Sequence, residues 1–207
     1  MEDKITTIKE WLGTGSINIF GLPMSGKDTQ GIRLAELLDA KFLSSGMIIR
    51  AMEEQTKKKY SQEGALIPTN VFYEWVLPYF ERRDLFNYPL VLSSIGRWQG
   101  EEEQVMSVAA RAGHDIKAVI LLNIREADVE NRFREARITG DRGSRADDKD
   151  LAIFHTRLKE FREKTIPVIQ HYNTLGLLIE VNGDQTRERV FNEIVDQLYA
   201  RASRSRA

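Results

Sequence analysis

The sequence predicts an α/β fold built on a doubly wound parallel sheet. Short apolar runs alternate along the chain with segments in which apolar residues recur at helical spacing. The run at residues 116–124, IKAVILLNI, is apolar throughout, as expected of a parallel strand buried on both faces. The first run, residues 17–20, leads into a glycine-bounded loop and then into a helix. Alternating strands and helices of this kind form βαβ units.

The loop after the first strand has the spacing of a phosphate-binding loop. Gly21, Gly26 and Lys27 form the pattern G-x-x-x-x-G-K. Glycines let several backbone N–H groups surround one phosphate, the lysine reaches the outer phosphates, and a helix N-terminus favours the anion. An ordinary glycine turn capped by Asp28 or Thr29 is the alternative. We favour the phosphate loop because strand, spacing, lysine and helix agree.

The elements follow in a regular order along the chain. Pro78 must kink or end the fourth helix, and Pro167 interrupts the long helix near the C-terminus. We expect strands at residues 17–20, 41–44, 89–92, 116–124 and 175–182. We expect helices at residues 3–12, 31–38 and 71–80, at about 150–173, and starting near residues 45, 127 and 186. The basic tail at residues 201–207 is expected to be disordered.

Composition excludes several classes of protein. The 207 residues contain 30 basic and 31 acidic side chains, so no overall field indicates nucleic acid or membrane as a partner. There is no cysteine, which excludes disulfides and thiolate zinc sites. The N-terminus lacks the apolar core of a signal peptide, and no run is long enough to span a membrane. We therefore expect an intracellular protein; the family resemblance described below adds the expectation of a cytoplasmic monomer.

A cluster of arginines lies between residues 132 and 145. Its members flank Gly140 and Gly143, and the positions are Arg132, Arg134, Arg137, Arg142 and Arg145. Such a run is usually a solvated face. In a chain that already has a phosphate loop we favour a mobile segment that closes over phosphate, because the planar guanidinium suits phosphate oxygens.

The order of these motifs resembles the adenylate kinase family of nucleoside monophosphate kinases, from about residue 17 to residue 198. GLPMSGKDTQ is similar to the family's GxPGxGKGTQ, FLSSGMIIR to its IS(S/T)GDLLR, and GALIP to its GxLVP. LSSIGRWQGEE resembles LDGxPR followed by a glutamine. RITGDRGSRADD resembles a short lid, RLKEFREKTIPVIQHY the helix that joins lid and core, and VNGDQTRERVF the end of the fold.

The resemblance implies a three-layer α/β/α fold of the P-loop nucleoside triphosphate hydrolase type with a five-stranded parallel sheet. It implies an N-terminal extra helix at 1–15, an adenylate-kinase-like domain at 16–200 and the tail at 201–207. Within the domain it implies a helical insertion that binds the nucleoside monophosphate, at about 45–80, and a short lid at about 138–147.

The implied activity is reversible phosphoryl transfer from ATP with Mg²⁺ to AMP, which needs positioning and positive charge more than covalent chemistry. The implied catalytic residues are Lys27, Arg97, Arg132, Arg145 and Arg157. ATP would contact Gly21, Met24, Ser25, Gly26, Lys27, Asp28, Thr29, Arg132 and Gln185. AMP would contact Ser45, Arg50, Ala65, Leu66, Ile67, Arg97, Gln99, Arg145 and Arg157.

Two carboxylates of the family pattern are missing. The aspartate of SGDLLR is Met47 here and that of LDGxPR is Ser93, while Ser94 and Gly96 replace the glycine and proline. Those aspartates are expected to order the water shell of Mg²⁺. Asp28 stands where the family has glycine, and our hypothesis is that it takes over part of this role without binding the metal directly. The opposite interpretation is repulsion between Asp28 and the polyphosphate.

Other departures leave alternatives open. Either Gln99 recognises the AMP amino group across a deletion or Glu101 falls at that position without one, and the following residues favour Gln99. The family has the pattern R-x-x-x-R at the lid, and its second arginine aligns with Ala136 here. Arg134 or Arg137 could supply this arginine from a neighbouring position. The alternatives for function are a UMP/CMP kinase of the same fold and a nucleotide-binding protein with little or no kinase activity.

Overall fold

The computed structural model describes residues 2–60, 64–139 and 150–205, and it confirms the predicted fold class. Its sheet has five parallel strands in the order β2-β3-β1-β4-β5. Every residue of β1 and of β3 is buried, as in strands covered on both faces. The strands are β1 (Ser16–Gly21), β2 (Lys41–Ser44), β3 (Leu90–Ser93), β4 (Ile116–Asn123) and β5 (Leu178–Asn182).

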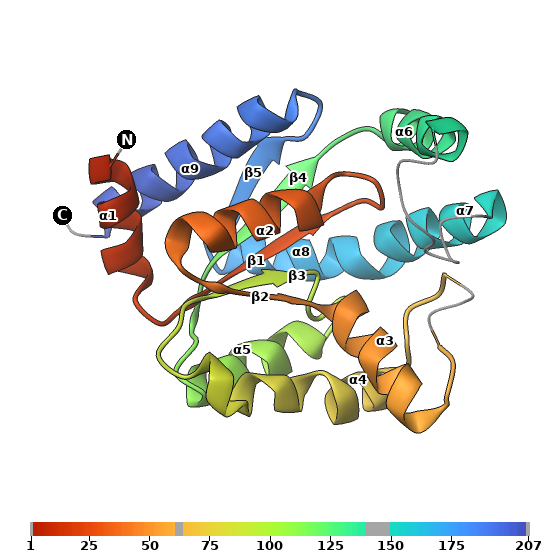
Figure 1. The fold of residues 1–207 in the computed structure, drawn as a ribbon, viewed down its shortest axis with the longest axis horizontal. Helices are drawn as coiled ribbons and strands as arrows, with labels where there is room; N and C mark the ends of the chain where they lie inside the picture. Colours follow the sequence, from red (N-terminus) through yellow and green to blue (C-terminus); the bar gives the residue numbers. More distant parts are fainter. Residues whose placement is uncertain (1, 61–63, 140–149, 206–207) are drawn as a thin grey trace.

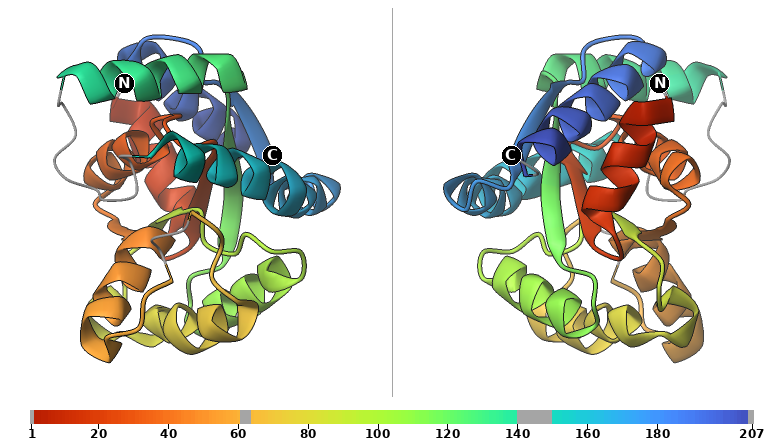
Figure 2. Two further views of the ribbon diagram at one scale, coloured as in Figure 1. Left: turned by 90° about the vertical axis from the view of Figure 1, so that its right-hand side faces the viewer. Right: turned by 90° about the vertical axis from the view of Figure 1, so that its left-hand side faces the viewer.

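Helices cover both faces of the sheet (Figures 1 and 2). Ile8 of α1, Leu34 of α2 and Ile194 of α9 belong to one buried cluster. Val105 of α5 and Tyr172 of α8 belong to the cluster that includes Phe20. The helices are α1 (Glu2–Leu12), α2 (Lys27–Leu38), α3 (Ser45–Thr56), α4 (Thr69–Trp75), α5 (Glu101–Arg111), α6 (Glu126–Thr139), α7 (Leu151–Glu160), α8 (Ile166–Thr174) and α9 (Arg187–Arg204).

The two prolines act near the places where the sequence predicts breaks. The helix before Pro78 ends at Trp75 and the chain continues as a 3-10 helix, Leu77–Glu81. Before Pro167 the long helix widens into a π-helical turn, Phe161–Thr165, and α8 then begins with the proline in its first turn. One helical column therefore runs from α7 to α8.

The N-terminal helix packs against the C-terminal one. The C-terminal helix continues through Arg204, where we expected a disordered tail to have begun at residue 201, and residues 206–207 of that tail lie outside the described residues. In Figure 1 α1 lies beside the end of α9, and Lys4 forms a 2.7 Å ion pair with Asp196. Helix α9 continues to Arg204. Arg201 donates hydrogen bonds to the carbonyl oxygens of Gly176 and Leu178, at 2.9 and 3.0 Å. These carbonyl groups hold residues 201–204 in the helix.

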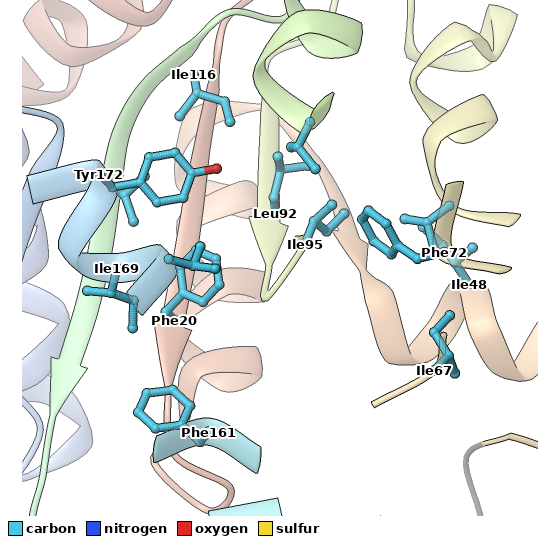
Figure 3. Close-up of a cluster of buried hydrophobic side chains, with 14 of the residues drawn as sticks. Phe20, Ile48, Ile67, Phe72, Leu92, Ile95, Ile116, Phe161, Ile169 and Tyr172 are labelled. Atoms are coloured by element: carbon cyan, nitrogen blue, oxygen red, sulfur yellow. The ribbon is translucent and has the colours of Figure 1, made fainter. Parts of the chain in front are cut away.

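One apolar cluster extends from the sheet into the segment near residues 45–80 (Figure 3). Phe20 and Tyr172 lie at its sheet end, with ring centroids 6.1 Å apart. Ile48, Ile67 and Phe72 lie at its other end. This continuous burial couples the segment that carries α3 and α4 to the core.

The strand order brings the loops after β1 and β3 together. The chain leaves the central strand β1, forms β2 and β3 on one side, and crosses to β4 on the other. In open α/β sheets a ligand crevice forms outside the carboxyl ends of the strands at such a switch point. Buried Asn18 ties the two loops: its Nδ2 donates to the carbonyl oxygen of Ile95 at 2.8 Å, and its Oδ1 accepts from the amide of Ile95 at 3.3 Å.

Two residues beside this crevice adopt left-handed backbone conformations without being glycine. Met24 has φ 65° and Ser94 has φ 53°. Both stand where the adenylate kinase pattern has glycine. A side chain in this region costs about 1–2 kcal/mol relative to the right-handed helix, because Cβ approaches the following carbonyl oxygen.

We therefore predict that Ser94→Gly raises the free energy of unfolding by about 0.5–1 kcal/mol, after the loss of chain entropy on folding is subtracted. Urea denaturation measures this change. Ser44→Gly is the matched control, because Ser44 is also buried beside the pocket but has φ −119°. The control is expected to lose stability, and an equal gain in both variants would contradict the explanation by backbone strain.

Candidate active site

A single pocket gathers most of the residues that the sequence singles out. It opens at the carboxyl ends of β1 and β3, and Figure 1 shows α3 and α4 on one side of this end and α6 and α7 on the other. Its lining includes the phosphate loop, residues 64–67 and the segment after β3. The predicted residues that line it are Gly21, Met24, Gly26, Lys27, Asp28, Thr29, Ser45, Arg50, Ala65, Leu66, Ile67, Arg97 and Arg157.

The phosphate loop has the compact form that its glycines predict. A Cβ on Gly21 would lie 2.6 Å from the Oγ of Ser25, so only glycine fits at the end of β1. Gly26 has φ +88° and caps α2, which begins at Lys27. The amides of the first turn of α2 therefore have no partner within the helix, and the helix dipole favours an anion in front of them.

Asp28 and Ser93 meet across the pocket. The hydroxyl of Ser93, at the end of β3, donates a 2.6 Å hydrogen bond to Oδ1 of Asp28 in the first turn of α2. A carboxylate from position 28 therefore lies at the side chain of position 93, where the sequence itself has no carboxylate. Thr29 lines the same pocket, so carboxylate and hydroxyl oxygens lie close to the phosphate loop.

Two guanidinium groups approach one another in the pocket. Burial, together with the charge of Arg157, lowers the pKa of Arg97 to about 10. The Nε of Arg97 is buried and has no hydrogen-bond partner among the described residues. Two like charges held together in a partly buried site are stabilised by an anion between them. The pocket is therefore suited to a phosphate group next to the phosphate loop.

Residues 64–67 are held against α7. Gly64 has φ +75°, and a Cβ there would lie 2.7 Å from the carbonyl oxygen of Ile153. The amide of Leu66 donates to Oε2 of Glu160 at 3.0 Å, and Lys164 pairs with the same oxygen at 2.6 Å. Sequence reasoning missed Glu160, because nothing local predicts a bond to an amide 94 positions away.

Arg50 lies over the start of its own helix. A Cβ on Gly46 would come within 3.1 Å of Nη1 of Arg50, so the glycine leaves room for the guanidinium. Ser45, Gly46 and Arg50 all line the pocket. This end of the pocket thus adds a third arginine to the two described above.

Of Gln99 and Glu101, the structure places Glu101 in the pocket. Gln99 is exposed and does not line the pocket, whereas Glu101 lines it and is only 2% exposed. Oε2 of Glu101 accepts from the amides of Arg97 at 2.8 Å and Trp98 at 3.0 Å. The loop from Arg97 to Glu101 therefore folds back on itself, with Gln99 on the outside.

Three other predicted residues lie elsewhere. Arg132 donates to the carbonyl oxygen of Gly183 at 3.1 Å, and Gln185 donates to that of Asn182 at 3.0 Å. Neither Arg132 nor Gln185 lines the pocket, and Ser25 does not line it either, although its Oγ packs under Gly21. Arg145 and most of the predicted lid, residues 140–149, lie outside the described residues.

The described part of the chain has no cluster of three or more His, Cys, Asp or Glu side chains that could bind a metal alone. None of the described helices is long and apolar enough to cross a membrane.

Curated proteins similar to the chain are adenylate kinases. The adenylate kinase of Micrococcus luteus is 29% identical over 189 residues, which covers 88% of this chain and 89% of that protein. That of Mycobacterium tuberculosis is 29% identical over 90% of this chain and 96% of its own length. That of Bacteroides fragilis is 27% identical over 86% of this chain and 95% of its own length. A scan of protein-family models found no match.

The buried carboxyl of Glu101 makes stability depend on pH. Burial raises the pKa of Glu101 above its ordinary value, and the hydrogen bonds from the amides of Trp98 and Arg97 offset this only in part. A raised pKa means that the folded state binds the proton more tightly. Protonation of Glu101 therefore contributes its full amount to the free energy of unfolding below the unfolded pKa, near 4.5. This contribution is lost as pH rises through the pKa of the folded state.

We predict that Glu101→Gln stabilises the protein at pH 8 by about 1.4 kcal/mol per unit of pKa shift, and that the gain disappears below pH 4.5. Urea denaturation across this pH range measures it. Glu103→Gln, at an exposed position on the same helix, is the control and should show no such gain. A gain that does not change with pH would contradict the raised pKa.

Proposed function

We propose that this chain, which belongs to the adenylate kinase family of nucleoside monophosphate kinases, transfers a phosphoryl group reversibly from ATP to AMP. An oxygen of the AMP phosphate forms a bond to the terminal phosphorus of ATP. The bond from that phosphorus to its bridging oxygen breaks, and the leaving ADP keeps the electron pair. Two molecules of ADP result.

One pocket holds both a phosphate loop and two adjacent guanidinium groups, and this observation carries the proposal. Lys27 and the amides around it would hold the donor phosphates, while Arg97 and Arg157 would lie next to the phosphoryl group in transfer. Phosphoryl transfer depends mainly on positioning and on positive charge around the transferring group. Arginine residues that are already crowded gain stability when this charge arrives.

The acceptor would bind at the other end of the pocket. Ser45, Arg50 and the backbone from Ala65 to Ile67 line that end. The bond from the amide of Leu66 to Glu160 fixes the backbone at this point, so the acceptor meets a preorganised wall. On the resemblance alone, we also propose that Arg132 and Gln185 contact ATP, and that Arg145 contacts AMP and the phosphoryl group in transfer.

The oxygen groups beside the phosphate loop fit a hydrated Mg²⁺. Mg²⁺ prefers oxygen ligands, keeps several waters and is usually bound through one or two carboxylates together with substrate phosphates. Asp28, oriented by the 2.6 Å hydrogen bond from Ser93, would order these waters, with Thr29 nearby. When bound with ATP, the ion would neutralise phosphate charge.

This arrangement favours an active kinase over a nucleotide-binding protein without turnover. The argument for inactivity was the absence of the carboxylates at Met47 and Ser93. Met47 is 51% exposed and does not line the pocket. Asp28, in contrast, brings a carboxylate to the oxygen of Ser93 itself. A carboxylate placed there would repel polyphosphate in the absence of a cation, so binding of ATP should require the metal.

We predict that the protein forms ADP from ATP and AMP with Mg²⁺ and stops when EDTA is added. Arg97→Met should lower kcat about 100- to 1000-fold, because it removes a positive charge from the transferring group. A coupled assay measures both. The control, Arg162→Met, removes an exposed arginine that pairs with Glu126 and should leave turnover unchanged. Absence of turnover in the wild type, with ATP still bound, would overturn the proposal.

We predict that the loss of ATP binding caused by a substitution at Asp28 is restored by a carboxylate at position 93. Asp28→Gly should weaken Mg²⁺-dependent binding of ATP about 10- to 100-fold. The double variant Asp28→Gly, Ser93→Asp returns the carboxylate from the opposite side, and we expect it to regain most of the loss. Titration calorimetry of ATP with Mg²⁺ and with EDTA measures binding independently of turnover. The idea of a relocated carboxylate fails if Asp28→Gly leaves the Mg²⁺ dependence unchanged.

A further inference from the structure

The loop that carries Arg97 ends at a buried carboxylate for which the proposed reaction has no use. Glu102, in the first turn of α5, is only 1% exposed. Its Oε2 accepts from the amide of Gly100 at 2.7 Å, and its Oε1 lies 2.8 Å from Nδ1 of His171 in the last turn of α8. A carboxylate only accepts hydrogen bonds, so Nδ1 of His171 is the donor. Buried carboxylates are retained where such bonds compensate for lost hydration.

The bond between Glu102 and His171 connects the two segments that carry the crowded guanidinium groups. The amide of Gly100 belongs to the loop that begins at Arg97. His171 belongs to the helical column that runs from α7 through the π-helical turn to α8, and Arg157 lies in α7 of the same column. The bond therefore holds the end of the loop against the column.

Other contacts make the same loop compact. Nζ of Lys164, in the π-helical turn of the column, lies 3.9 Å from the centroid of the Trp98 ring. Within the loop, Glu101 accepts from the amides of Arg97 and Trp98, and it has a side-chain hydrogen bond with Thr69 of α4. The loop is therefore one compact unit, and the column contacts it both at this ring and at its end.

A fixed contact matters here because Arg97 and Arg157 repel one another. Burial lowers the pKa of Arg97, and the charge of Arg157 lowers it further. Without an anion between the two groups, this repulsion favours a loop that is displaced from the column. We propose, building on the proposed function, that Glu102 and His171 are positioning residues that hold the loop at the column, so that both guanidinium groups are in place before the acceptor phosphate arrives.

Loss of this pair should weaken binding of the acceptor and leave the chemical step intact. The apparent affinity of a ligand falls in proportion to the fraction of molecules whose site is competent to bind it. A bound phosphate draws Arg97 and Arg157 together again, so turnover at saturating acceptor is retained. The phosphate loop is not part of this contact, so the affinity for ATP should not change.

The experiment compares His171→Leu with His171→Asn in the coupled assay. His171→Leu should raise the KM for AMP about 10-fold and leave kcat within about twofold of the wild type. The amide NH₂ of His171→Asn donates from nearly the position of Nδ1, so this variant should keep the KM of the wild type. Titration calorimetry of ATP should give equal Kd values in all variants. Gln170→Leu, at an exposed position on the same helix, is the control and should match the wild type.

A double variant separates positioning from stability. His171→Leu leaves a carboxylate oxygen of Glu102 buried without its partner, which lowers stability whatever the role of the pair. Glu102→Met combined with His171→Leu removes the buried charge, and the amide of exposed Gly100 can then donate to water. The urea midpoint should therefore return toward that of the wild type while the KM for AMP stays raised. A KM that recovers together with the midpoint would mean a merely structural pair and would overturn the inference.

The outcomes also separate this inference from the proposed function. If the wild type phosphorylates AMP and His171→Leu has the same KM, the inference is wrong and the kinase stands. If the wild type forms no ADP, the proposed function fails, and the Kd for AMP, measured by titration calorimetry, still decides the inference: equal binding in wild type and His171→Leu overturns it. If His171→Leu does not fold, the double variant provides the same comparison.

Discussion

The pairing of β1 with β3 is the constraint on which the pocket depends. Parallel pairing aligns Ile19 of β1 with Ser93 of β3, so the loops that leave both strands start at the same edge of the sheet. Asn18 then bonds both backbone groups of Ile95. Because these strands are buried on both faces, a change of register would disrupt the packing of their side chains against the helices on either side. This pairing therefore fixes the positions of the phosphate loop, of Asp28 at the start of α2 and of the loop that carries Arg97.

The charged and strained groups in the pocket lower the stability of the protein when no anion is bound. Arg97 lies near Arg157, and burial together with this like charge lowers its pKa to about 10. Glu101 is a buried carboxylate, and burial raises its pKa above the ordinary value. Ser94 keeps a left-handed backbone without being glycine. Strained and unpaired groups of this kind gather at functional sites, where a bound ligand compensates for them.

The sequence predicted the fold well because each of its signals was local. Apolar runs revealed the strands, and the spacing of Gly21, Gly26 and Lys27 revealed the loop. It failed where a contact depends on distant partners. The tail from Arg201 is held in α9 by the carbonyl groups of Gly176 and Leu178, and the partner of the Leu66 amide is Glu160. Spacing within the chain contains no information on such contacts.

The sequence by itself determined the fold class, the phosphate loop and the loss of carboxylates at positions 47 and 93. Only the tertiary structure placed the carboxylate of Asp28 at the hydroxyl of Ser93. Asp28 reaches Ser93 because the strand order brings the start of α2 beside the end of β3. Glu101 rather than Gln99 enters the pocket because two backbone amides turn its side chain inward. Both results depend on where side chains point in three dimensions, which residue identity and spacing do not specify.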